Sequence, residues 1–176
     1  MSDFNEALKT VLQAEGPGGV IDPQDPGGLT VWGITRTYEQ TWPGWPRFDD
    51  LHKSVSRPVA GGQPVTWAQD EQLMAYVTAY YRQVWESMLL DGVKSQTLAT
   101  SVFGAFVNEG PKVVRWLQAA AGATVDGVWG PATIAAANAA PCVWEKFSIL
   151  RLKYYNQTAK DVYLRGLFDR VLVVGA

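Results

Sequence analysis

A glutamate at the end of an amphipathic segment is the side chain best suited to acid–base chemistry. Glu15 follows an amphipathic stretch, residues 3–14, and is itself followed by Gly16-Pro17, which stops a helix. The negative end of a helix dipole and a nearby apolar face both disfavour an ionised carboxylate, so we expect the pKa of Glu15 to be raised. A carboxyl that keeps its proton near neutral pH can protonate a glycosidic oxygen.

Three further polar residues follow on a loop and a strand that can fold back over Glu15. Asp22 and Asp25 belong to the turn-rich segment 22–28, and Thr30 lies in the apolar stretch after it. A second carboxylate there could orient water or stabilise an oxocarbenium-like transition state, and the Thr30 hydroxyl could hold that water. The alternatives are structural, because a glutamate at a helix end is usually solvated and the Asp-Pro-x-Asp-Pro-Gly-Gly run is typical of turns.

The stretch from Glu15 to Thr35 also carries a longer pattern. Its Asp-Pro-x-Asp-Pro-Gly-Gly-x-Thr-x-x-Gly-Ile-Thr run resembles the front end of the glycoside hydrolase family 108 muramidases, which are phage-type lysozymes. Residues 97–140 resemble the helical peptidoglycan-binding partner of these enzymes. The matching segments there are 107–111, 116–120 and 125–131.

This resemblance implies a mainly α (α+β), lysozyme-like fold with two lobes, a cleft, and a small β element beside the catalytic loop. It implies hydrolysis of the β-1,4 bond between N-acetylmuramic acid and N-acetylglucosamine in peptidoglycan, without a cofactor. By position, Glu15 corresponds to the catalytic acid, and Asp25 and Thr30 correspond to the Asp and Thr of phage lysozymes. The chain departs from the pattern after Glu15, where Gly-Pro-Gly-Gly is one residue longer than usual, and at Trp32, where Tyr is common.

Aromatic side chains are frequent, with eight Trp, seven Tyr and six Phe among 176 residues. Ring faces are surfaces on which sugars can lie. We expect three that fall within the Gly/Pro-rich segment to line a glycan cleft: Trp32, Trp42 and Trp45. Tyr81 and Trp85 could flank sugars, with core packing as the alternative. Glu109 could line the cleft floor, with a structural role at a helix end as the alternative.

Composition excludes several other classes of chemistry. Cys142 is the single cysteine and His52 the single histidine, so an internal disulfide and a Cys/His zinc site lack their residues. A serine-type triad would have to use His52, for which an exposed loop position is the alternative, and the chain has no Gly-x-Ser-x-Gly elbow. We find no metal-ligand cluster. The formal net charge of −2 argues against a nucleic-acid partner.

Location and partners can also be anticipated. No stretch approaches the ~20 apolar residues of a membrane span, so we expect no stable membrane insertion. The first residues lack a basic start and an apolar run, so we expect a protein held in the cytoplasm of a host bacterium. The resemblance implies a monomeric endolysin that a holin releases onto the cell wall, where peptidoglycan glycan strands are its partner.

The elements that must position these residues are mostly helices. Asp3 and Glu6 form a capping box that opens the helix at 3–14. Residues 16–64 hold nine of the 17 Gly and seven of the ten Pro, so we expect loops there and one strand over 29–34. The Thr66–Gln69 capping box predicts a long second helix. Further helices are expected at 98–107, from 111, from 131, near 143–154 and at 164–172.

We divide the chain into a muramidase lobe, 1–94, and a helical lobe of peptidoglycan-binding type, 95–176, packed as one compact unit. Two alternatives to a muramidase stay open. A lytic transglycosylase would use Glu15 alone and leave a 1,6-anhydro product. A non-catalytic peptidoglycan-binding or phage structural module would have lost activity through the altered loop after Glu15.

Overall fold

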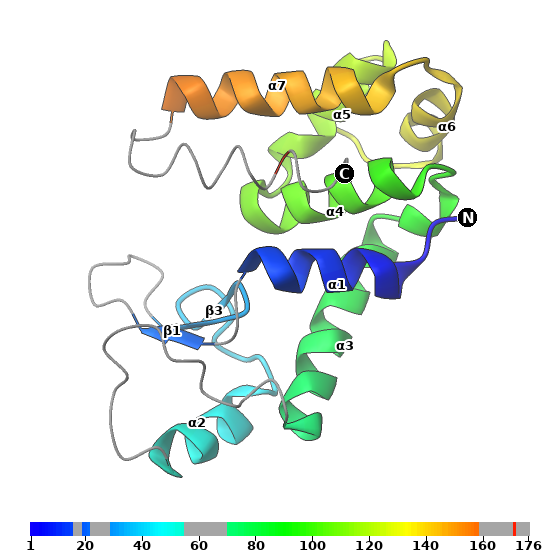
Figure 1. Ribbon diagram of the computed structural model, residues 1–176. Helices are drawn as coiled ribbons and strands as arrows, with labels where there is room; N and C mark the ends of the chain where they lie inside the picture. The colour runs from blue at the N-terminus through cyan, green and yellow to red at the C-terminus, as the bar shows by residue number, and fades with distance from the viewer. Residues whose placement is uncertain (16–18, 22–28, 55–69, 159–170, 172–176) are drawn as a thin grey trace. The chain divides into compact units, whose positions relative to one another are not determined.

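The computed structural model describes residues 1–15, 19–21, 29–54, 70–158 and 171 (Figure 1). This part of the chain is mostly helical with one small antiparallel sheet, which confirms the expected fold class. The elements are α1 (Phe4–Glu15), β1 (Gly19–Ile21), β2 (Leu29–Val31), β3 (Ile34–Thr35), α2 (Trp45–Ser54), α3 (Glu71–Ser87), the 3-10 helix η2 (Leu90–Gly92), α4 (Gln96–Glu109), α5 (Lys112–Ala121), α6 (Pro131–Ala139) and α7 (Val143–Thr158).

The chain forms two compact units. Unit 1 contains residues 1–11 and 84–176, and unit 2 contains residues 12–83. α1 and α3 each contribute residues to both units, so this grouping differs from a boundary placed after residue 94. The assignment of a muramidase role to 1–94 and a peptidoglycan-binding role to 95–176 stays a prediction.

The sheet of unit 2 has the order β1-β2-β3 with antiparallel neighbours. The expected single strand over 29–34 is wrong, because the chain reverses between Val31 and Ile34, which pair with each other. The two residues between them, Trp32 and Gly33, have φ angles of 44° and 81°. Positive φ at both central residues is the signature of a tight hairpin turn whose twist suits the flanking strands.

α2 forms within the stretch that we expected to be loops and strand. Trp45 packs edge-on against Trp42, with ring centroids 4.9 Å apart, and against Phe48 at 6.1 Å. Pro46 lies in the first turn of the helix, where a proline costs no hydrogen bond. The apolar cluster at the start of α2 therefore outweighs the Gly/Pro content of the surrounding segment.

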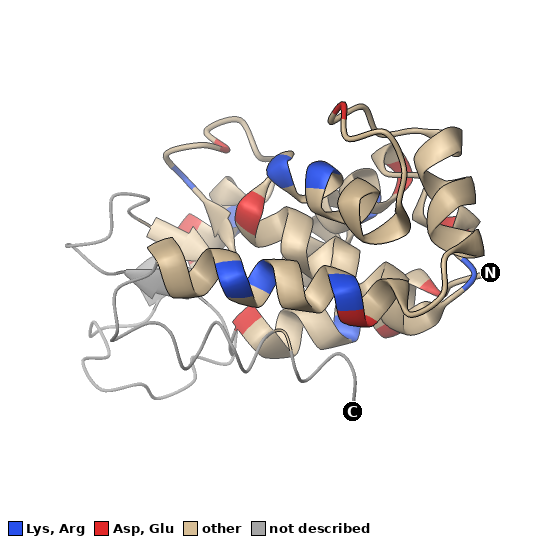
Figure 2. Cartoon of the chain, turned by 90° about the horizontal axis from the view of Figure 1, so that it is seen from above, with Lys and Arg blue, Asp and Glu red and all other residues tan. Residues whose placement is uncertain are grey.

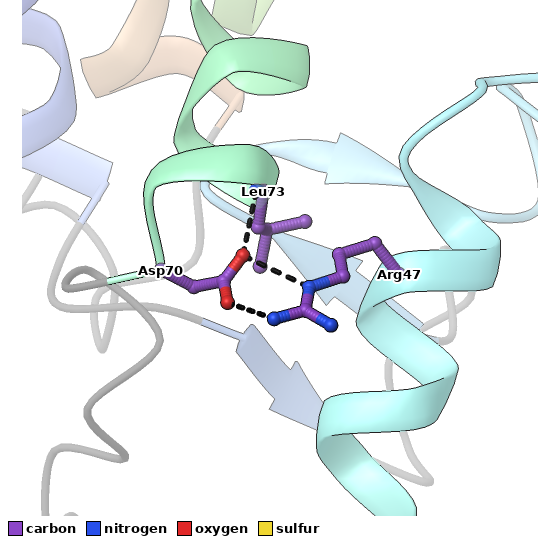
Figure 3. Close-up of polar contacts among 3 residues, drawn as sticks. All are labelled: Arg47, Asp70 and Leu73. Atoms are coloured by element: carbon purple, nitrogen blue, oxygen red, sulfur yellow. Dashed lines mark hydrogen bonds and ion pairs between the residues drawn. The ribbon is translucent and has the colours of Figure 1, made fainter.

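α3 is joined to α2 at its first turn by a polar contact (Figure 3). Asp70 accepts a hydrogen bond from the backbone N–H of Leu73 at 2.8 Å, which makes it the cap of α3. The Arg47 guanidinium forms a bidentate ion pair with the same carboxylate, with 3.0 Å from Nε to Oδ1. This pair lowers the pKa of Asp70. The expected cap at Thr66–Gln69 lies outside the described residues.

Unit 1 is a helical core around α4. As the lack of charged residues over 98–107 indicated, the middle of α4 is buried, and α5 and α7 both pack against this helix. Phe4 of α1, Trp85 of α3 and Phe103 of α4 form one aromatic cluster with centroid distances of 5.4 to 6.2 Å. Asp3 caps α1 by accepting a hydrogen bond from the backbone N–H of Glu6 at 3.0 Å, which is one half of the predicted capping box. The Asp3 backbone N–H donates to Gln96 Oε1 at 2.5 Å.

Charge and hydropathy show no membrane-type element in the part of the chain that the structure describes. Lys, Arg, Asp and Glu occur together on the same helices (Figure 2). None of the described helices combines the length and the apolar character needed to cross a bilayer. The helix expected at 164–172 lies outside the described residues, apart from Val171.

Candidate active site

Glu15 is the last residue of α1. Its side chain is half-buried, and its Oε1 atom is shielded from solvent. The local helix pattern, with buried residues on one face and Glu15 at the final turn, places the carboxyl at the negative end of the helix dipole. The structure therefore confirms the prediction that Glu15 lies at the C-terminal end of its helix.

The turn of the β2–β3 hairpin lies directly against this carboxyl. A Cβ atom added to Gly33 would stand 3.2 Å from Glu15 Oε2 and 3.0 Å from the hydroxyl oxygen of Tyr81. These distances are tighter than ordinary van der Waals contact, so a side chain here would displace the carboxyl or the hydroxyl by a few tenths of an ångström. The Gly33 backbone consequently forms one wall beside the Glu15 carboxyl.

Tyr81 fixes this turn from α3. Its hydroxyl donates a hydrogen bond to the Trp32 carbonyl, and the side chain is fully buried. A tryptophan with positive φ is strained, and such strain persists only where the surroundings hold it. The Tyr81 hydrogen bond and the burial of Trp32 provide that restraint. Three segments distant in sequence thus meet at Glu15.

Of the other two expected catalytic residues, the structure describes Thr30 only. Thr30 is half-buried in β2, paired with Val20 of β1 and Thr35 of β3. Asp25 lies outside the described residues. The catalytic roles of Glu15, Asp25 and Thr30 stay predictions. Within the described residues, no group of three His, Cys, Asp or Glu side chains could hold a metal ion.

Sequence reasoning did not single out Glu39, a carboxylate of unit 2 that lies near Tyr80. Glu39 Oε1 accepts a hydrogen bond from the Tyr80 hydroxyl at 3.1 Å. Burial, together with the Glu39 charge, raises the pKa of Tyr80 to about 12. The Tyr80 ring meets the Tyr81 ring edge-on at 5.4 Å, so Glu39 is linked through two tyrosines to the hairpin beside Glu15. No spacing pattern in the sequence marks Glu39.

The three tryptophans expected to line a glycan cleft are buried. Trp32, Trp42 and Trp45 are 3%, 6% and 5% exposed. In this conformation the structure shows them as core residues, and a sugar-binding role for them stays a prediction that requires the rings to be uncovered. The exposed large aromatic side chain in the described part of unit 2 is Tyr38, at 75%.

The remaining expected binding residues also have structural contacts. Tyr81 and Trp85 are fully buried. The Trp85 indole donates a hydrogen bond to Asp91 Oδ1 at 2.8 Å. Glu109, at the end of α4, pairs with the Lys112 ammonium at 3.0 Å. These contacts are the core-packing and helix-end roles that the sequence left as alternatives.

Comparison with known proteins provides an independent assignment. The glycosyl hydrolase 108 family model matches residues 8–110, a range that includes Glu15, Gly33 and Tyr81. Among solved structures, the chain is similar to that of Brucella abortus SagA, with a TM-score of 0.66 and 25% sequence identity. That alignment covers 97% of this chain and 90% of SagA. No curated protein matches the chain.

Proposed function

Because this chain belongs to the glycosyl hydrolase 108 family and is a glycoside hydrolase, we propose that it is an N-acetylmuramidase with Glu15 as its general acid. The family supports peptidoglycan as the substrate. The proposed bond is the β-1,4 linkage between N-acetylmuramic acid and N-acetylglucosamine. The observation that carries the role of Glu15 is the close approach of the hairpin turn to its carboxyl, where a Cβ added at Gly33 would stand 3.2 Å from Oε2.

In the proposed reaction, the Glu15 carboxyl gives its proton to the glycosidic oxygen as the bond from that oxygen to the anomeric carbon breaks. The developing charge on the sugar is oxocarbenium-like, and water adds to the anomeric carbon while a carboxylate of the site, Asp25 or the ionised Glu15, takes the proton that the water loses. We assign the orientation of this water, or the stabilisation of the charge, to Asp25 with Thr30. The resemblance of their segment to the phage-lysozyme motif supports that assignment.

The surroundings of Glu15 suit a group that must be held in one position. The Gly33 backbone stands beside one carboxyl oxygen, and the other oxygen is buried. The Tyr81 hydroxyl keeps the turn in place. Catalytic groups act best when packing and hydrogen bonds limit their motion, because orientation is then already established before the substrate binds.

Clearing of purified cell walls tests this proposal. Glu15→Gln keeps the size of the side chain but removes the transferable proton, so we expect the rate of turbidity loss to fall by about 10²–10⁴-fold. Glu6→Gln, an exposed change on the same helix, is the matched control and should clear walls like the wild type. Equal clearing by wild type and Glu15→Gln, or no clearing by either, contradicts the assignment.

The resemblance to phage-type muramidases supports a biological extension of the proposal. The protein would wait as a monomeric endolysin in the host cytoplasm until a holin opens the membrane. Expression with and without a holin tests this, because lysis should require the holin. Lysis without a holin would contradict the extension.

A further inference from the structure

Unit 1 contains a surface pocket of about 570 Å³ that the proposed reaction does not use. The end of α3, η2 and α6 provide its lining. Its volume falls within the range of small-ligand sites, roughly 300–1,000 Å³. The pocket is therefore large enough for a short peptide segment.

Hydrogen bonds hold the walls of the pocket in place. Asn138 of α6 donates to the Gly92 carbonyl at 2.8 Å and accepts from the Lys94 backbone N–H at 2.8 Å. The indole of Trp129, just before α6, donates to the Met88 carbonyl at 2.6 Å. Both contacts connect the α6 side to the α3–η2 side, so the pocket is formed before any ligand arrives.

The lining is apolar, and one wall is strained. Ile134 and Ala135 of α6 contribute apolar surface from one side. Leu89 faces them from the other side with a φ of 45° and a side chain that is 49% exposed. A leucine rarely adopts the left-handed conformation, and an exposed one gains little from burial. Strain of this kind is concentrated at binding sites.

Two carboxylates complete the lining. Glu86, near the end of α3, and Asp91 of η2 both line the pocket and are exposed. Neither forms an ion pair with another described residue, although Asp91 accepts the Trp85 indole hydrogen bond. The pocket thus combines a mostly apolar lining with two carboxylates that form no ion pair with other described residues, a combination that is complementary to an aliphatic chain ending in a cation.

We propose that this pocket binds the aminoalkyl side chain of the diamino acid in the peptide stems of peptidoglycan. The methylene groups would lie against Leu89, Ile134 and Ala135, and the ammonium group would face Glu86 and Asp91. This inference rests on the proposed function, which supplies peptidoglycan as the polymer. It adds a peptide-recognition site to an enzyme whose chemistry acts on the glycan.

Calorimetric titration of the full chain with synthetic L-Ala–γ-D-Glu–L-Lys tests the inference. We expect the wild type to bind this peptide, and acetylation of the lysine Nε to weaken binding by roughly three- to tenfold, since it removes the charge. Glu86→Gln should weaken binding to a similar extent. Glu145→Gln, an exposed acidic position on α7 of the same unit, is the matched control and should bind like the wild type.

A second variant tests the apolar wall. Leu89→Asn removes the apolar side chain but suits the left-handed conformation, so it should fold with an unchanged Tm and lose peptide binding. The inference is overturned if the wild type does not bind the peptide at millimolar concentration, if the acetylated peptide binds equally well, or if Glu145→Gln weakens binding as much as Glu86→Gln.

The failure of this inference can be told apart from failure of the proposed function. Glu15→Gln should lose wall clearing but bind the tripeptide with unchanged affinity, because Glu15 is not in the pocket. A wild type that clears walls but does not bind the peptide refutes the pocket alone. A wild type that binds the peptide but clears no walls refutes the hydrolase proposal alone.

Discussion

Gly33 lies where a side chain would meet two groups of the candidate site. A Cβ there would stand 3.2 Å from Glu15 Oε2 and 3.0 Å from the Tyr81 hydroxyl oxygen. Gly33→Ala should therefore displace the carboxyl and lower kcat for wall hydrolysis by at least about tenfold. It should also lower the free energy of unfolding by roughly 1–2 kcal/mol, because alanine is strained at positive φ.

Gly122 is the matched control for this change. It also has a positive φ, 69°, but a Cβ there would meet nothing within 4 Å. Gly122→Ala should lose comparable stability in thermal unfolding and keep its hydrolytic rate. If both variants keep the wild-type rate, the close approach of Gly33 to the carboxyl has no part in catalysis.

Substitution of Trp42 distinguishes a core-packing role of its ring from a sugar-binding role. Its ring is 6% exposed, and Gly44 lies against it with no space for a side chain. Trp42→Ala should lower the free energy of unfolding by about 3–5 kcal/mol. Tyr38→Ala, which removes an aromatic ring that is 75% exposed, should leave Tm nearly unchanged. A Trp42→Ala protein with wild-type Tm and weakened wall binding would instead favour the glycan-lining role.

The contrast between Glu15 and the tryptophans shows what a sequence can predict about single residues. The place of Glu15 follows from local information, namely a periodic apolar face and the residues that end the helix. Whether Trp32 or Trp42 is buried depends on segments that meet only after folding. Composition showed that aromatic side chains are unusually frequent. It could not show which of them pack in the core and which lie on a surface that could bind sugars.

At the scale of elements, the hairpin was missed because its turn lacks the usual residues. Asn-Gly or Asp-Gly normally marks such a turn, whereas this chain has Trp32-Gly33. α2 was missed because the Gly and Pro content of residues 16–64 outweighed its short apolar pattern. The described helices after residue 95, α4 to α7, were predicted well, since each carries either buried residues at helical spacing or a proline at its start.

Asp70 connects α2 to the beginning of α3, and its charge should matter in a pH-dependent way. The Arg47 ion pair and the hydrogen bond from the Leu73 backbone N–H lower its pKa from 3.8. A lowered carboxyl pKa gives stability that is present above the unfolded value and is lost as the pH falls through the folded value. Asp70→Asn should therefore lower Tm at neutral pH, by about 2–4 °C.

The difference between Asp70→Asn and wild type should shrink below pH 3.8 and disappear once the native carboxyl is protonated. Asp70→Ala also removes the cap of α3, so it should be less stable than Asp70→Asn at every pH. Thermal unfolding between neutral and acid pH measures both effects. A constant difference between Asp70→Asn and wild type across that range would show that the ion pair contributes nothing.

At the scale of the whole molecule, the helical core continues beyond the residues that the family model matches. The model ends at Gly110, but α4 packs against α5 and α7, which follow that residue. A chain truncated after Gly110 would expose the apolar surface of α4. We expect it to lack a cooperative thermal transition and to be inactive on cell walls. A truncated chain that folds and hydrolyses cell walls would show that neither folding nor activity requires α5, α6 and α7.

The organisation of the whole chain was the part least accessible from sequence. A boundary after residue 94 assumes that units are continuous segments. Unit 1 takes residues 1–11 together with 84–176, and within it Phe4 packs with Trp85 and Phe103. Contacts between distant segments of this kind leave no local sign in the sequence.

The chemical identity of the digestion products tests the central claim most directly. Mass spectrometry of muropeptides released from purified peptidoglycan by the wild-type protein should show reducing N-acetylmuramic acid ends. Those products should be lost with Glu15→Gln and kept with Glu6→Gln. Reducing N-acetylglucosamine ends, or 1,6-anhydro-muramic acid ends from a lytic transglycosylase, would contradict the proposal that this chain is a hydrolytic N-acetylmuramidase.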